Sequence, residues 1–199
     1  SSNQYLTRYS ITLAAQVSAE LPGDATTTDV TDAYIRKQAG DETVRTGLRC
    51  LAHAMDDRVI TALPIREAEQ ILRRSPALMT APSAIDTVLN ECPLITNRQG
   101  YVRFAHDQLG RFLAAEHFVL AATDGVALAH ILAQPTHHDL QETALQLETD
   151  PGRRYDAIRE LAQWQVLAAA VYGKFGDEIA KLARADITGL LIEAAATAA

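Results

Sequence analysis

Lysine and cysteine are both scarce in this chain of 199 residues, which has three lysines, at 37, 174 and 181, and two cysteines, Cys50 and Cys92. Two cysteines cannot build a disulfide framework or a four-cysteine zinc site, and such usage indicates a reduced, cytoplasmic setting. None of the lysines lies in the glycine-rich sequence of a phosphate-binding loop, and no hydrophobic run ends in paired acidic residues. The chain is therefore not expected to hydrolyse a nucleoside triphosphate, or to be an enzyme, by itself.

Positive charge is also in short supply. The chain has 18 Lys and Arg against 25 Asp and Glu, a formal net charge of −7, and a pI near 5.3. Such an acidic balance disfavours broad binding along a nucleic-acid phosphate backbone, although it leaves room for a local basic patch. The hydrophobic fraction of 48% is enough for one large domain or two small ones.

No apolar run is long enough to cross a bilayer, and no association with a membrane is expected. The longest run, residues 161–171, contains Gln163, Trp164 and Gln165. The N-terminus lacks the basic start and apolar run of a signal peptide. It also lacks an initiator Met and begins almost directly in a helical pattern, which predicts that the chain is a piece of a longer protein.

Most of the chain has apolar residues at the spacing that is typical of α-helices. Gly40 ends one predicted helix. Possible N-caps are residues 27–29, Asp41 and Ser83, and Pro64 precedes another helix. Apolar residues recur three and four positions apart in the segments that we expect to be helical: 4–20, 30–37, 44–55, 65–72, 85–89, 105–122, 125–133, 138–148, 154–172 and 175–195.

Two short β-type runs interrupt the helices. Residues 93–96 and 101–104 are separated by Asn-Arg-Gln-Gly at 97–100, which predicts a hairpin turn. A series of helices followed by helix, strand, turn and strand is the pattern of a winged helix. The predicted fold class is therefore mostly α: a winged-helix domain with a short β-hairpin, followed by an α-helical domain.

The most informative stretch is residues 101–120. We expect a strand to deliver Phe104 inward, and His106 to lie at the N-terminus of the long helix that follows. Unpaired backbone N–H groups and the helix dipole favour an anion there, and an imidazole adds a further donor. Further along this helix, Leu109, Phe112 and Leu113 are predicted to form the buried face, Ala114 and Ala115 to allow close helix packing, and Glu116 and His117 to lie on the surface.

This stretch resembles the signature that ends the winged-helix domain of NACHT-type signal-transduction ATPases, the STAND class that includes the NOD-like receptors. That signature reads roughly Phe-x-His-x-x-Phe-x-Glu-Tyr/Phe-x-Ala-Ala. It is matched here by Phe104, His106, Phe112, Ala114 and Ala115. Leu109 replaces the first aromatic residue, and Arg111 replaces the acid.

The resemblance implies an order of domains along the chain. Residues 1–40 would be the helical segment that ends the first helical domain, residues 41–122 the winged-helix domain, and residues 123–199, by position, the second helical domain. It also implies two partners, an upstream NACHT NTPase domain and a downstream sensor domain of the same parent chain. Assembly into a homo-oligomer would accompany activation.

The resemblance further implies a nucleotide-dependent switch. His106 would contact the β-phosphate of ADP bound in the upstream domain, and exchange of ADP for ATP would release the winged helix. The parent protein would hold the ADP or ATP, and these 199 residues alone would hold none. The implied function is a regulatory, autoinhibitory arm in signalling, for which bacterial defence is a natural setting.

A winged-helix module that binds DNA or another protein is the alternative, and an enzyme with its own active site is a third. The recognition helix of a DNA-binding module would be residues 83–91, which carry two acids and no Lys or Arg, the wrong charge for a phosphate-lined groove. Arg98 and Arg103 are the nearby basic residues, and a protein-interaction module explains them equally well.

No metal site is predicted. His137 and His138 are adjacent in the sequence, so that their side chains point apart, and no third ligand has motif spacing. We expect the segment His-His-Asp at 137–139 to be a solvated turn. Cys50 and Cys92 are expected to be small buried residues, and Trp164 to belong to a helix–helix core.

Overall fold

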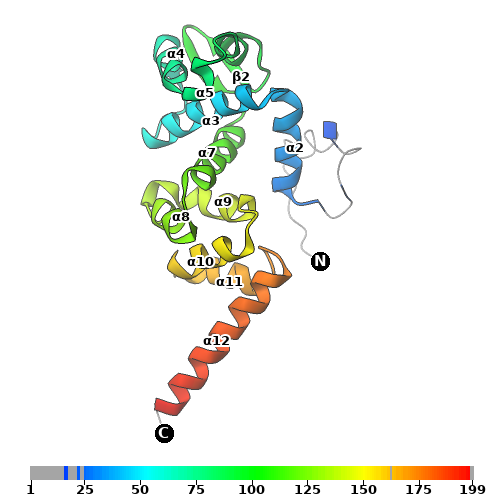
Figure 1. The fold of residues 1–199 in the computed structure, drawn as a ribbon, viewed down its shortest axis with the longest axis vertical. Helices are drawn as coiled ribbons and strands as arrows, with labels where there is room; N and C mark the ends of the chain where they lie inside the picture. Colours follow the sequence, from blue (N-terminus) through cyan, green and yellow to red (C-terminus); the bar gives the residue numbers. More distant parts are fainter. Residues whose placement is uncertain (1–15, 18–21, 23–24, 162, 198–199) are drawn as a thin grey trace. The chain divides into compact units, whose positions relative to one another are not determined.

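The structure is a computed structural model that describes residues 16–17, 22, 25–161 and 163–197. Within these residues the fold is mostly helical with one three-stranded antiparallel sheet, which confirms the predicted fold class. The chain divides into two compact units, Ser1–His117 and Phe118–Ala199 (Figure 1). The predicted helix over 4–20 lies outside the described residues, except for the helical pair at 16 and 17. Among the described helices, none has the length and apolar character needed to span a membrane.

The first unit begins with two consecutive helices, α2 (Thr27–Ala39) and α3 (Glu42–Asp57). The N-cap of α2 is Thr26, one residue earlier than predicted. A capping box is formed because the Thr26 hydroxyl accepts the N–H of Asp29 while the Asp29 carboxylate accepts the N–H of Thr26. As predicted, Gly40 ends α2, with φ of +68°, and Asp41 caps α3.

The rest of the first unit has the element order of a winged helix. Pro64 directly precedes α4, as predicted, but Ser83 is the first residue of α6 and makes no side-chain cap bond, because Pro82 is already in a helical conformation. The elements are β1 (Leu63–Pro64), α4 (Ile65–Arg74), α5 (Pro76–Met79), α6 (Ser83–Asp86), the π-helix η2 (Thr87–Glu91), β2 (Ile95–Arg98), β3 (Tyr101–Phe104) and α7 (Asp107–Ala121).

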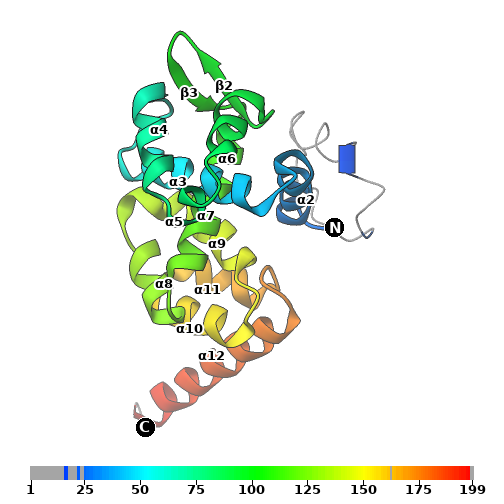
Figure 2. The same ribbon diagram turned by 45° about the horizontal axis from the view of Figure 1, so that its top comes forward.

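The sheet has the order β1–β3–β2, with both pairings antiparallel. Gln99 and Gly100 both have positive φ, 54° and 78°. This is the requirement of a two-residue type I′ turn. The first predicted strand therefore lies two residues later in the chain, at Ile95–Arg98, and the hairpin projects from the helices of its unit (Figure 2). The sequence did not predict β1, whose Leu63 lies opposite Val102.

The core of the first unit forms where α3 meets α5 and η2. Gly47 allows this approach, because a Cβ at that position would lie 2.9 Å from Val88 Cγ2 and 3.2 Å from Leu78 Cδ2. The largest fully buried side chains of this unit are Ile35, Leu48, Leu51, Leu63, Leu72, Leu78, Leu94, Leu109 and Leu113.

The second unit is helical throughout its described residues. Pro135 and Pro151 begin helices, and the segment 154–172, predicted as one helix, contains parts of two. The elements are α8 (Gly125–Leu132), the 3₁₀ helix η3 (Pro135–Leu140), α9 (Gln141–Leu147), α10 (Pro151–Leu161), α11 (Trp164–Val171) and α12 (Asp177–Thr197).

Helices α8 and α10 meet at Gly125. A Cβ on this residue would lie 2.2 Å from the backbone oxygen of Arg153, a distance that side-chain rotation cannot relieve. Arg153 also donates from Nη2 to the carbonyl oxygen of Ala122 at 3.0 Å, which satisfies a carbonyl at the C-terminus of α7. The start of α8 thus lies directly against the backbone of the first turn of α10, and the Arg153 side chain connects that turn to the end of α7.

The contact at Gly125 predicts a sharp difference between two Gly→Ala substitutions. Gly125→Ala should lower the free energy of unfolding by about 2–3 kcal/mol, because the helices must separate to admit a methyl group. Gly189→Ala, in α12 with no atom within 4 Å of the new Cβ, should raise it by about 0.5–1 kcal/mol. Urea unfolding followed by circular dichroism measures both, and equal effects would contradict the packing described for α8 and α10.

Candidate functional site

His106 lies in the two-residue connection between β3 and α7. Its Nδ1 accepts the backbone N–H of Gln108 at 3.2 Å, and its carbonyl oxygen accepts the N–H of Leu109 at 3.0 Å. The imidazole therefore caps the first turn of α7. When Nδ1 accepts a hydrogen bond, the proton of the neutral ring is on Nε2, which is then a donor.

Phe104 positions this connection. Its ring is buried, and a Cβ at Gly110 would lie 2.8 Å from the ring atom Cδ2. Gly110 therefore lets the first turns of α7 lie directly over the aromatic ring, a role that the signature does not mark. The other residues of the signature, Leu109, Phe112, Ala114 and Ala115, are all buried on α7.

The charges near His106 are mixed. Asp107 is exposed in the first turn of α7, where its negative charge complements the helix dipole. Arg111, which replaces the acid of the signature, is also exposed. An anion at this helix end would thus meet one negative and one positive side chain as well as the backbone N–H groups.

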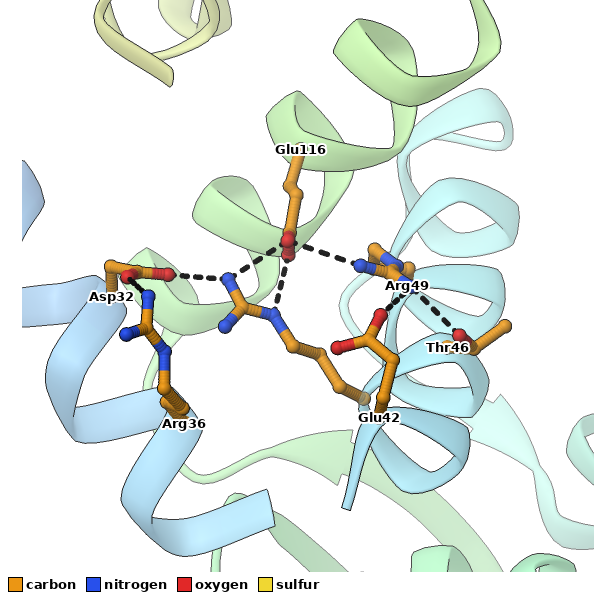
Figure 3. Close-up of polar contacts among 7 residues, drawn as sticks. Asp32, Arg36, Glu42, Thr46, Arg49 and Glu116 are labelled. Atoms are coloured by element: carbon orange, nitrogen blue, oxygen red, sulfur yellow. Dashed lines mark hydrogen bonds and ion pairs between the residues drawn. The ribbon is translucent and has the colours of Figure 1, made fainter. Parts of the chain in front are cut away.

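A larger polar cluster lies around Glu116, further along α7. Glu116 Oε1 is 2.8 Å from Arg45 Nη2 and 3.1 Å from Arg49 Nη1, and Arg45 Nε donates to Glu116 Oε2 at 3.1 Å (Figure 3). The Arg45 side chain is 8% exposed and that of Glu116 14%. One carboxylate on α7 therefore binds two buried guanidinium groups on α3.

Further acids complete this arginine–glutamate cluster. Asp32 on α2 accepts from Arg45 and is also paired with Arg36 one turn along its own helix. Glu42, in the first turn of α3, accepts from Arg49, which also donates to the Thr46 hydroxyl (Figure 3). Burial lowers the pKa of Arg45, but the hydrogen bonds that Arg45 donates to Asp32 and Glu116, and the charges of these two carboxylates, outweigh it, so that the pKa of Arg45 lies above its ordinary value.

The prediction that Glu116 and His117 lie on the helix surface is wrong. Glu116 follows Leu109, Phe112 and Leu113 by seven, four and three residues, so its spacing places it on the same face of α7 as these buried residues, and α3 covers that face. That spacing was a signal that the prediction did not use, and a second was available. Arg45 and Arg49 are four residues apart among buried positions of α3, an arrangement that requires a carboxylate on the facing helix.

His117 stacks on His53 of α3. The ring centroids are 4.3 Å apart with an interplanar angle of 12°. Burial lowers the pKa of His117 from 6.5 to about 4, with smaller contributions from His53 and Arg49. The ring is therefore neutral at physiological pH, which suits its position beside a buried guanidinium group.

The segment His137-His138-Asp139 is not a solvated turn throughout. His137 is 6% exposed, its Nδ1 lies 2.8 Å from the carbonyl oxygen of Ile131, and its ring packs against Phe118 at 4.5 Å. It belongs to η3 because Pro135 begins a helical turn that carries it inward. Cys92 is buried, as predicted, and Cys50 is only half-buried. No group of three or more His, Cys, Asp and Glu that could hold a metal ion occurs among the described residues.

Comparisons with protein-family models, with curated proteins and with solved structures each found no match to this chain.

The arginine–glutamate cluster predicts an asymmetric cost of removing carboxylates. Glu116→Gln should lower the free energy of unfolding by about 3 kcal/mol, because two buried guanidinium groups lose their shared counter-charge. Glu69→Gln, which removes an exposed pair with Arg73 on α4, should cost less than about 1 kcal/mol. Urea unfolding of both variants measures the difference, and a loss at Glu116 as small as that at Glu69 would contradict a buried role.

The stacked histidines predict a pH dependence of stability. The unfolded chain takes up a proton at residue 117 near pH 6.5, whereas the folded chain does so only near pH 4. The free energy of unfolding should therefore have its full value above pH 6.5 and decrease as the pH falls towards 4. His117→Gln should flatten this part of the profile, and exposed His138→Gln should not. Identical slopes for all three proteins in urea titrations would show that His117 does not cause the dependence.

Proposed function

We propose that this chain is the regulatory arm of a STAND signalling NTPase of the NACHT type. In this proposal the winged helix contacts ADP bound in an upstream NTPase domain, and His106 donates to a phosphate oxygen. The observation that carries the proposal is the position of His106, at the N-terminus of a fifteen-residue helix with Nδ1 already accepting the N–H of Gln108. Because Nδ1 accepts this bond, the proton of the neutral ring is on Nε2, which can then donate to a phosphate oxygen.

The energy of such a contact is sufficient for a switch. A hydrogen bond to a charged group contributes about 1.5–3 kcal/mol, so its loss would weaken ADP binding about 10- to 150-fold. The positive end of the α7 dipole adds attraction, while Asp107 reduces it. Because ATP carries a further phosphate, exchange would change the contact and shift the population away from the closed state.

The arm itself performs no catalysis in this proposal. The ADP or ATP belongs to the NTPase domain of the parent protein, and the second unit relays the state of a downstream sensor domain. The setting is the cytoplasm, with bacterial defence as the natural context and a homo-oligomer as the active form. The burial of Leu109, Phe112, Ala114 and Ala115 supports the proposal, since a helix fixed by its core can transmit a force applied at His106.

A protein-interaction module is the second candidate. Tyr101 and Arg103 are exposed on β3, and Arg98 lies opposite Tyr101 on β2, so three exposed side chains share the outer face of the hairpin. DNA binding is less well supported, because the exposed positions of α6 and η2 include Asp86, Asn90 and Glu91, of which two are acidic.

The test uses the native protein that contains this sequence. Wild type, His106→Ala and His138→Ala would be purified and denatured, and the released ADP and ATP quantified by chromatography. We expect near-stoichiometric ADP in wild type and in His138→Ala, whose histidine is exposed in the second unit, and little ADP in His106→Ala. Equal ADP in all three proteins would reduce His106 to a helix cap, and no nucleotide in wild type would contradict the proposal itself.

A further inference from the structure

One face of the small sheet is left uncovered by the rest of its unit. Residues paired across antiparallel strands project to the same side of a sheet, as do alternate residues along one strand. Tyr101 lies opposite Arg98 on β2 and opposite Pro64 on β1, and all three are exposed. Arg103, two residues along β3, is also exposed and lies opposite the half-buried Thr96. We call these five residues the hairpin face (Figure 2 shows β2 and β3).

Tyr101 is the apolar centre of the hairpin face. It is 53% exposed, and the exposed ring of Pro64 lies beside it on the neighbouring strand. Tyrosine and arginine are enriched among the residues that dominate binding energy at protein interfaces. An aromatic ring with few rotatable bonds also loses little conformational entropy when it is covered. The face therefore combines an apolar anchor with two positive charges.

Those two charges have no acidic partner within the described part of the chain. Neither Arg98 nor Arg103 forms an ion pair there. The exposed Arg73 of α4 differs, because it pairs with Glu69 one turn earlier in its helix. A carboxylate from another molecule could thus bind either guanidinium group of the hairpin face without displacing an acid from the described residues.

Arg103 is already oriented for such a contact. Its Nε donates to Thr96 Oγ1 at 3.2 Å, and the Thr96 hydroxyl donates to the carbonyl oxygen of Arg103 at 3.4 Å. These bonds use Nε and leave the two Nη groups for an acceptor outside the sheet. Because the side chain is held before binding, less conformational entropy is lost when the acceptor arrives. Parallel N–H groups of a planar guanidinium group fit the two oxygens of a carboxylate.

The spacing of the two arginines matches that of an extended chain. They are diagonal neighbours, since Arg98 lies opposite Tyr101 and Arg103 follows Tyr101 by two residues. Diagonal neighbours in a sheet are about 7–8 Å apart, and alternate residues of an extended segment are about 6.5 Å apart. Two carboxylates at alternate positions of one segment can therefore reach one guanidinium group each.

Nucleic acid fits the surroundings less well. The apolar row of Pro64 and Tyr101 beside the arginines suits an apolar side chain better than a phosphate. Asp86 and Glu91 are exposed on α6 and η2 of the same unit, and the whole chain has a net charge of −7. A long polyanion meets this repulsion along its length, whereas a segment with two acids meets it mainly at the hairpin face.

We propose that the hairpin face binds an extended acidic segment of a partner protein. Two carboxylates at alternate positions of the segment pair with Arg98 and Arg103, and a neighbouring apolar side chain packs on Tyr101 and Pro64. The proposal rests on the second candidate function, the protein-interaction module, and gives the chemistry of its partner. It does not use His106, so that it and the nucleotide contact can each fail while the other holds.

The test is fluorescence anisotropy of a labelled synthetic peptide titrated with the 199-residue chain. The peptide contains Glu-Thr-Glu-Thr-Leu between short flanks of Gly and Ser, which places both carboxylates and the leucine on one side when it is extended. A second peptide has glutamine in place of both glutamates. An oligothymidylate of about ten nucleotides with the same label represents nucleic acid.

Three variants remove parts of the hairpin face, namely Arg98→Gln, Arg103→Gln and Tyr101→Ala. Arg73→Gln is the matched control, because it removes an exposed arginine of the same unit from α4. We expect the acidic peptide to bind wild type more tightly than the glutamine peptide or the oligothymidylate. Each variant of the face should weaken this binding by about 3- to 10-fold, and Arg73→Gln should change it by less than about two-fold.

Four results would overturn the proposal. An equal loss for Arg73→Gln would mean that net charge alone attracts the peptide. Equal binding of the glutamine peptide would remove the role of the carboxylates, and tighter binding of the oligothymidylate would assign the face to nucleic acid. No binding of the acidic peptide at about 1 mM would leave the face without the proposed partner chemistry.

Discussion

The carboxylate of Glu116 is the charge on which the first unit depends. It lies between two guanidinium groups of α3, and without it Arg45 would be left with Asp32, and Arg49 with Glu42, whose side chain is 71% exposed. Its hydrogen bonds to Arg45 and Arg49 connect α7 to α3 at one defined position along both helices. Asp32 and Glu42 then bring the carboxylates to three against the two arginines of α3, and Asp32 connects α2 to the cluster.

Helix α7 connects this cluster to the proposed nucleotide contact. His106 and Glu116 are ten residues apart, or roughly 15 Å along a helix axis. The first half of the helix is fixed by the ring of Phe104 against Gly110, and the second by Glu116. A rigid element held at both ends moves with the whole winged helix, which is the mechanical property that a nucleotide-dependent arm requires. The stacked pair of His53 and His117 lies beside the cluster and keeps a neutral ring next to Arg49.

Local signals in the sequence were sufficient for most helices and for the hairpin. Each of these signals depends only on residues close by in the sequence. Gly40 ends a helix, Asp41 caps one, Pro64 precedes one, and Pro135 and Pro151 begin helices. The strand β1 was missed because two residues carry no periodicity, and its pairing of Leu63 with Val102 is a tertiary contact. His117 and His137 were misplaced because helices distant in sequence cover them, whereas the spacing of Glu116 from Leu109, Phe112 and Leu113 already places it on the buried face of α7. His106 is the residue whose position follows directly from its neighbours, a strand before it and a helix after it.

The central structural claim is that Arg45 and Glu116 interact directly as a buried pair, and a double-mutant cycle tests it most directly. The free energy of urea unfolding would be measured for wild type, Arg45→Gln, Glu116→Gln and the double variant. The account predicts that the loss in the double variant is smaller than the sum of the single losses by at least about 1.5 kcal/mol, because either change alone leaves a buried charge behind. Losses that add to within about 0.5 kcal/mol would contradict it, and α7 would then be held by its apolar face alone.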